Sequence, residues 1–98
     1  MDVYVNLKKY GRRVLLSICD ADMLGRTLKQ GKIVFHIHEE FYKGSLVSLE
    51  EAADLIPKSS IINMVGHKIV KMAVERGFVH PDAVLEIEGV PHAQIVKL

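Results

Sequence analysis

The stretch that decides the fold is Ser48–Pro57, which reads SLEEAADLIP. Ser48 and Glu51 have the spacing of a capping box, in which two side chains satisfy backbone N–H groups at the start of a helix. The apolar residues that follow recur at the i, i+3, i+4, i+7 positions of one helix face, and Pro57 disfavours helical geometry in the residue before it. We therefore predict a short amphipathic helix whose buried face holds Leu49, Ala52, Ala53 and Ile56.

The sequence on both sides of this helix has the patterns of β-strands. Residues 3–7 alternate apolar and polar side chains, Gly11 suits a hairpin turn, and residues 12–19 are apolar enough for a central strand. Further strands are predicted over 33–37, 84–88 and 93–98. This order predicts an α+β fold with a mostly antiparallel sheet of about five strands and two main helices on one face.

Residues 60–76 allow two interpretations. A helical period runs through Ile62, Val65 and Ile69, and Gly77 is suited to end such a helix. The alternative is a strand over 61–66 that ends at Gly66. We predict a helix over 60–76, in which Gly66 costs ~1 kcal/mol relative to alanine and therefore implies a close approach of another group.

Composition limits the class of protein. The chain has 98 residues, of which 49% are hydrophobic and 26% charged, as expected for one globular domain spanning 1–98 and not for a disordered chain. A single cysteine excludes an intramolecular disulfide framework and a cysteine-based zinc knuckle. The N-terminus is not that of a signal peptide, and no apolar run approaches the ~20 residues of a membrane span. We expect a cytoplasmic protein with no membrane partner.

Charge is unevenly distributed along the chain. The formal net charge is +1, but residues 1–32 carry seven basic and three acidic side chains, whereas residues 33–57 carry one basic and five acidic side chains. A basic N-terminal third favours contact with phosphate groups, and the alternative is a solvated hairpin whose lysines protect a sheet edge. The predicted nucleic-acid contacts are Lys8, Lys9, Arg12, Arg13 and Arg26.

Two constellations raise the question of catalysis or metal binding. Cys19 lies at a strand end before Asp20, where a thiol pKa is lowered if a helix starts there, and His92 is the candidate base for such a nucleophile. The alternative is a buried free cysteine. His36 and His38 lie two apart on a predicted strand and would share a face, where a third histidine or a carboxylate such as Glu40 would complete a metal site. The alternative is a pair on a solvated sheet face, which needs no metal. We predict no metal and no cofactor.

Several short motifs, in order and spacing, resemble the archaeal family called domain of unknown function 424 over nearly the whole chain. They are Cys19-Asp20 with Met23–Gly25, EEFYKG at 39–44, NMVG at 63–66, ERGFV at 75–79 and GVPHAQI at 89–95. The resemblance implies an archaeal, cytoplasmic protein with a role linked to RNA or translation. The matched motif positions are Asp20, Gly25, Asn63, Gly66, Pro91, His92 and Gln94.

The matched polar residues predict one ligand-binding site if the fold brings them together. Asn63 and Gly66 would share a face of the predicted helix, and His92 and Gln94 share a face of the last strand. The alternative is that Asn63 and Gln94 satisfy backbone groups in the core. Our leading hypothesis is a non-enzymatic RNA-binding or translation-associated accessory protein. The alternatives are a small enzyme centred on Cys19 and His92, and a protein-interaction module such as a homodimer joined by an edge strand.

Overall fold

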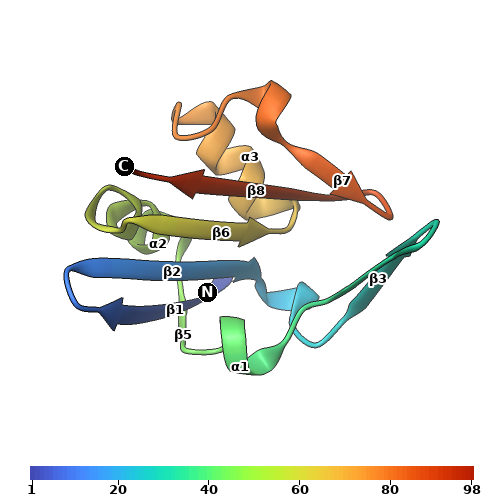
Figure 1. Cartoon of the computed structure of the whole chain (residues 1–98), viewed down its shortest axis with the longest axis horizontal. Helices are drawn as coiled ribbons and strands as arrows, with labels where there is room; N and C mark the ends of the chain where they lie inside the picture. Colours follow the sequence, from blue (N-terminus) through green and yellow to red (C-terminus); the bar gives the residue numbers. More distant parts are fainter.

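A six-stranded sheet and a separate two-stranded arm form the framework of the computed structural model, which describes residues 1–98 (Figure 1). The strands are β1 (Val3–Tyr10), β2 (Arg13–Asp20), β3 (Thr27–Gln30), β4 (Ile33–His36), β5 (Ser45–Val47), β6 (Ile61–Val65), β7 (Leu85–Ile87) and β8 (Val90–Val96). The helices are α1 (Glu39–Tyr42), α2 (Leu49–Leu55) and α3 (His67–Glu75), with short 3-10 helices at Ala21–Met23, Ile56–Lys58 and Pro81–Ala83.

The main sheet has the order β5-β1-β2-β6-β8-β7, and β3 pairs with β4 in the arm. Every pairing is antiparallel except that of β2 with β6, which is parallel. The predicted α+β class with a mostly antiparallel sheet is therefore confirmed. The predicted number of about five strands was too low because β3 and β5 are short strands without a clear alternation of apolar and polar residues, and because β6 was predicted to be part of a helix.

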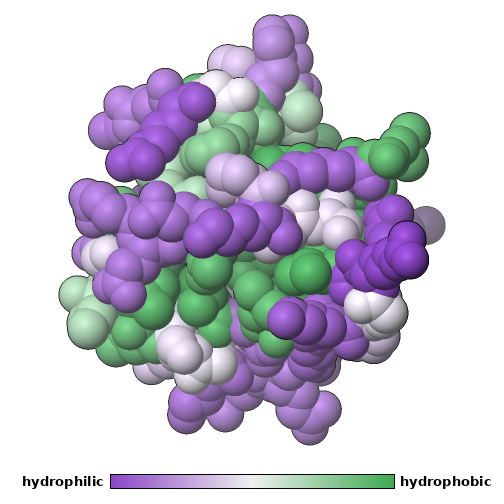
Figure 2. All heavy atoms as spheres, turned by 90° about the vertical axis from the view of Figure 1, so that its left-hand side faces the viewer, coloured by the Kyte–Doolittle hydropathy of each residue, from purple (hydrophilic) through white to green (hydrophobic).

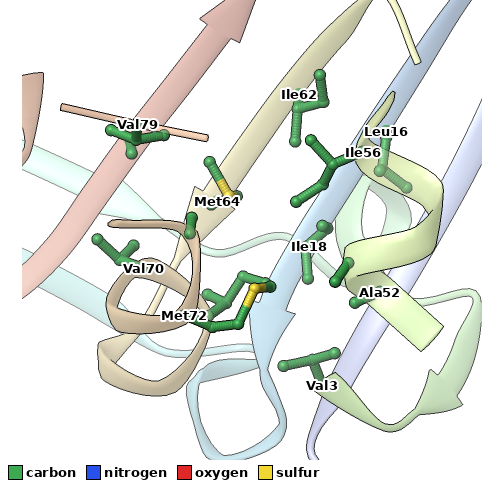
Figure 3. Packing of buried hydrophobic residues seen from close by; sticks show 14 of the residues in the cluster. Val3, Leu16, Ile18, Ala52, Ile56, Ile62, Met64, Val70, Met72 and Val79 are labelled. Carbon is green, nitrogen blue, oxygen red and sulfur yellow. The ribbon is translucent and has the colours of Figure 1, made fainter. Parts of the chain in front are cut away.

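One face of the sheet packs against α2 and α3, which pass behind the strands in Figure 1. The apolar side chains of the two helices interlock there with those of β1, β2 and β6 (Figure 3). Full burial of such a side chain contributes about 1.5–3 kcal/mol, so this cluster is the main source of stability. Its largest fully buried members are Leu16, Ile18, Ile56, Ile62, Met64 and Ile69.

The predicted helix over 60–76 is wrong in its first half. Residues 61–65 form strand β6, and α3 begins only after Gly66. Ile62 and Met64 of β6 face α2 and α3, and Val65 on the opposite face is also buried, so apolar residues occur on both faces of the strand and the segment resembles helical periodicity. Gly66 has φ 124° and ψ 157°, which ends any helical path through this point.

The predicted helix start at Ser48 and the predicted helix end at Gly77 are confirmed. The Ser48 hydroxyl accepts a hydrogen bond from the Glu51 N–H, and the Glu51 carboxylate accepts one from the Ser48 N–H. At the end of α3, the Phe78 N–H donates to the Ala73 carbonyl and the Gly77 N–H donates to that of Val74, which is a Schellman motif. No helix of the structure is long and apolar enough to cross a membrane.

The opposite face of the sheet is only partly covered. Helix α1 and the β3–β4 arm pack against the end of the sheet at which β2 and β6 finish, and a second hydrophobic cluster lies beneath them. The remainder of this face carries no covering helix (Figure 1). We call the whole face of the sheet opposite α2 and α3 the open face. The buried members of the second cluster are Cys19, Met23, Leu28, Ile37, Tyr42, Val65 and Val90.

Candidate functional site

A row of polar side chains crosses the open face. Residues that pair across neighbouring strands point to the same side of a sheet. The pairings of β1 with β2, β2 with β6 and β6 with β8 align four polar residues in one row across the sheet. The neighbouring row on the same face ends in β8 at His92, which pairs with Val65. The polar row comprises Asn6, Ser17, Asn63 and Gln94.

A pocket of about 550 Å³ lies where this row meets the arm. Strands β6 and β8 supply its floor, and β4, α1 and the segment that joins them supply a wall. Six of the eleven Phe, Tyr and His rings of the chain line this one pocket. The lining residues are Phe35, His36, His38, Phe41, Tyr42, Asn63, Met64, Val65, Ala83, Leu85, His92, Ala93 and Gln94.

Two amide side chains form the polar part of the floor. Gln94 Nε2 donates a hydrogen bond of 2.9 Å to Asn63 Oδ1. This bond leaves the Asn63 amide N–H groups and the Gln94 carbonyl oxygen without a protein partner. Exchanging oxygen and nitrogen in both amides would leave the same result, one free donor beside one free acceptor. The floor therefore presents adjacent donor and acceptor groups to a ligand.

His92 adds a third polar group. Its Nε2 atom is buried and has no hydrogen-bond partner, which is uncommon for a buried polar atom. The ring packs against Phe35 in an edge-to-face arrangement, with 4.7 Å between ring centroids. Burial lowers the pKa of the imidazole, so that the neutral form is favoured. No Asp, Glu, Lys or Arg lines the pocket, whose interior is therefore polar in places but holds no permanently charged side chain.

His36 and His38 both reach the pocket, although β4 ends at His36. Their rings are in edge-to-face contact at 4.4 Å, and His36 Nδ1 lies 2.6 Å from Thr27 Oγ1 in the neighbouring strand. No three histidine, cysteine, aspartate or glutamate side chains are arranged to hold a metal ion. The pair therefore belongs to the aromatic lining.

The structure brings Asn63, His92 and Gln94 together but places Gly66 elsewhere. The predicted helical face shared by Asn63 and Gly66 is wrong, because Asn63 lies in β6 and Gly66 precedes α3. A Cβ atom at Gly66 would lie 2.3 Å from the Cγ atom of Asp20. Asp20 is buried and accepts hydrogen bonds from the N–H groups of Lys68 and Ile69 at the start of α3. Gly66 thus makes room for a helix cap and does not touch the pocket.

The predicted basic residues are not in one cluster. Lys8 in β1 lies two residues from Asn6 and therefore on the open face, and Arg13 in β2 lies on the same face because it pairs with Tyr10. Lys9, the next residue after Lys8, falls on the opposite face. Lys8 Nζ lies 3.5 Å from the carbonyl oxygen of Glu40 in α1. Arg12 is at the tip of the β1–β2 hairpin, and Arg26 precedes β3. Figure 2 views the hairpin end of the molecule, where hydrophilic side chains surround smaller apolar areas.

Cys19 has none of the properties of a nucleophile. The side chain is fully buried in the second cluster. Burial is the main cause that raises its pKa to about 12, and the nearby carboxylates of Asp20 and Asp22 add to the effect. The thiolate is the reactive form of cysteine, so this environment suppresses reactivity. The structure therefore fits the alternative interpretation of a buried free cysteine.

Sequence reasoning missed the aromatic wall. Phe41 and Tyr42 fall in the EEFYKG motif, whose side chains were assigned to no site, and Phe35 lies in a strand with no recognised role. The one available signal was the concentration of rings within residues 35–42. Their common orientation depends on the arm folding back over the sheet, which the sequence pattern does not specify.

The fold and the site define a small α+β protein whose uncharged, ring-lined pocket opens on the face of the sheet opposite the helices. The chain belongs to the family described as Protein of unknown function (DUF424), whose model matches residues 8–98. It is also similar to a solved structure, the crystal structure of an uncharacterized conserved protein from Methanopyrus kandleri. That similarity has 31% sequence identity and a TM-score of 0.81 and covers 97% of this chain and 90% of the other. No curated protein matches the chain.

Proposed function

We propose that this protein binds single-stranded RNA on the open face of the sheet. The observation that carries the proposal is the uncharged aromatic pocket with Asn63, His92 and Gln94 at its floor, on the same face as Lys8 and Arg13. Proteins that bind single strands combine rings that stack on bases with cations that contact the phosphates. The two halves of that arrangement share one surface here.

The structure also favours binding over catalysis. The candidate nucleophile Cys19 is buried and its thiol is held in the protonated form. The pocket offers hydrogen bonds and stacking surfaces, and its lining contains no carboxylate, lysine or arginine. We therefore propose a non-enzymatic accessory role. We also keep the expectation of an archaeal, cytoplasmic protein, because the resemblance implies it and a single free cysteine needs no oxidising compartment.

The test is the affinity for a fluorescent single-stranded RNA of mixed sequence, measured by anisotropy at 50 and 200 mM salt. Two phosphate contacts give a slope of about −1.4 in log K against log salt, and hence a loss of roughly sevenfold over this range. Lys8→Glu is expected to weaken binding strongly. Lys9→Glu is the matched control, because it makes the same charge change one residue away on the opposite face.

Two results would contradict the proposal. One is the absence of any RNA binding at 50 mM salt. The other is an equal effect of Lys8→Glu and Lys9→Glu, since this would mean that net charge rather than the open face determines the affinity. Circular dichroism of both variants confirms that the fold is retained, and both side chains are exposed.

One observation favours a second candidate function, self-association. Strand β5 pairs with β1 only through Val3–Val5, so the outer edge of β1 from Asn6 to Tyr10 has no neighbouring strand. A free edge of this length is a template for pairing with a second copy, although charged residues such as Lys8 and Lys9 oppose it. Light scattering at several protein concentrations tests this candidate, and a constant monomer mass would exclude it.

A further inference from the structure

We infer that the pocket is a site for a single purine base. The inference rests on the proposed function, because the natural ligand would be a base within an RNA strand. It adds the chemical class of the group that enters the pocket. It is carried by four features: the size of the pocket, the absence of charge in its lining, the paired amides of its floor and the rings of its wall.

The lining selects a neutral ligand of small-molecule size. The volume of about 550 Å³ falls within the ~300–1,000 Å³ of pockets that hold small molecules. In the pocket, a phosphate or carboxylate would meet histidines but no lysine or arginine, and burial favours the neutral form of His92. An uncharged heterocycle with polar edges meets no such penalty.

The floor matches the edge of a nucleobase. Every base carries hydrogen-bond donors and acceptors side by side on its edges, and adenine presents the N6 amino group next to N7 or N1. The free donor of Asn63 and the free acceptor of Gln94 lie next to each other because the two side chains are hydrogen-bonded at 2.9 Å. His92 also lines the pocket, and its Nε2 atom has no hydrogen-bond partner in the protein.

The wall explains a preference for purines. Phe35 and Phe41 are half-buried, and both line the pocket from the arm and from α1. Stacking on such rings is tolerant of sequence but grows with the area of the base, so that a two-ring base gains more than a one-ring base. Lys8 and Arg13 lie outside the pocket on the same face, where the backbone phosphates of a bound RNA strand would pass.

The experiment compares oligoadenylate and oligouridylate of equal length at one salt concentration, because the two share a backbone and differ only in the base. We expect oligoadenylate to bind about tenfold more tightly. Gln94→Leu removes the free acceptor while keeping an exposed side chain of similar size, and it should remove most of this preference. Lys8→Gln is the control, since it should weaken both oligonucleotides equally and leave their ratio unchanged.

Free adenosine separates the two proposals. Equilibrium dialysis with adenosine should show binding that Gln94→Leu weakens and Lys8→Gln does not change. Equal affinities for the two oligonucleotides, together with no adenosine binding, would overturn the purine site while leaving RNA binding intact. Adenosine binding without any RNA binding would overturn the proposed function and support the purine site. The absence of binding to both would overturn both proposals.

Discussion

Adding one methyl group at Gly66 is expected to cost most of the stability of this protein. The Cβ atom of Gly66→Ala would lie 2.3 Å from Asp20 Cγ, 2.6 Å from Oδ2 and 2.7 Å from Cβ. These contacts involve a buried side chain that is held by two backbone hydrogen bonds of 2.8 and 3.0 Å, so neither group can move freely. The substitution therefore has to displace Asp20 from the N-terminus of α3.

The magnitude follows from two contributions. A non-glycine residue in the backbone conformation of Gly66, φ 124° and ψ 157°, costs about 1–3 kcal/mol. Each hydrogen bond lost from the Asp20 carboxylate costs about 1.5–3 kcal/mol because the acceptor is charged. The total is about 4–9 kcal/mol, compared with about 5–15 kcal/mol for the whole stability of a domain of this size. We expect Gly66→Ala to be partly or wholly unfolded at 25 °C.

The assay is urea unfolding followed by circular dichroism, with Gly89→Ala as the matched control. Gly89 also has a positive φ of 77°, but a Cβ atom there meets nothing within 4 Å. It should therefore cost only about 1–2 kcal/mol. In the double variant Asp20→Gly/Gly66→Ala, no Asp20 side chain remains to clash with the new methyl group. The loss of unfolding free energy in the double variant should therefore be smaller than the sum of the losses in the two single variants. A loss for Gly66→Ala no larger than that for Gly89→Ala would refute this reasoning.

Three further predictions concern other parts of the molecule. Cys19 should not react with a thiol reagent in the folded protein at pH 8 and should react fully in urea; rapid reaction without urea would contradict its burial and its pKa of about 12. Ser48→Ala should cost about 1 kcal/mol in urea unfolding, because it removes the cap of α2, and Ser45→Ala, on an exposed strand position, is the control. Burial lowers the pKa of His92 below its ordinary value of 6.5, so its contribution to stability is present above pH 6.5 and is lost as the pH falls through the lowered pKa. Stability measured between pH 7.5 and pH 5 should decline less steeply in His92→Gln, and an unchanged slope would exclude this cause.

Helix ends were predictable from sequence because they depend on local chemistry. The hydrogen bonds between Ser48 and Glu51 join residues three apart, and the Schellman motif at Gly77 involves only the last turn of α3. The segment at 61–65 was not predictable in the same way. Its apolar residues face two layers, because Ile62 and Met64 pack in the cluster under α2 and α3 and Val65 packs in the second cluster on the other face. Tertiary burial on two faces removed the alternation that identifies a strand.

The candidate site also has a part that local sequence predicts and a part that depends on contacts distant in sequence. His92 and Gln94 share a face because they are two residues apart in one strand, which the sequence alone predicts. Their approach to Phe35 and Phe41 depends instead on the arm folding over the sheet. Contacts between residues far apart in sequence hold the arm there, such as the hydrogen bond that the Lys29 N–H donates to the Glu88 carboxylate across a separation of 59 residues. Sequence patterns of short range carry no information about such a contact.

Gly66 and Asn63 were predicted to serve one site, and the structure gives them complementary tasks on two sides of the sheet. The pairing of β2 with β6 sets Ser17 opposite Asn63 and Cys19 opposite Val65, and the next residue of each strand brings Asp20 to Gly66. The contact between Asp20 and Gly66 therefore fixes the register of these two strands. A slip of one residue would turn Asn63 toward α2 and α3 and separate it from Gln94. The paired amides of the pocket floor thus depend on a tight contact that lies on the opposite side of the sheet and outside the pocket.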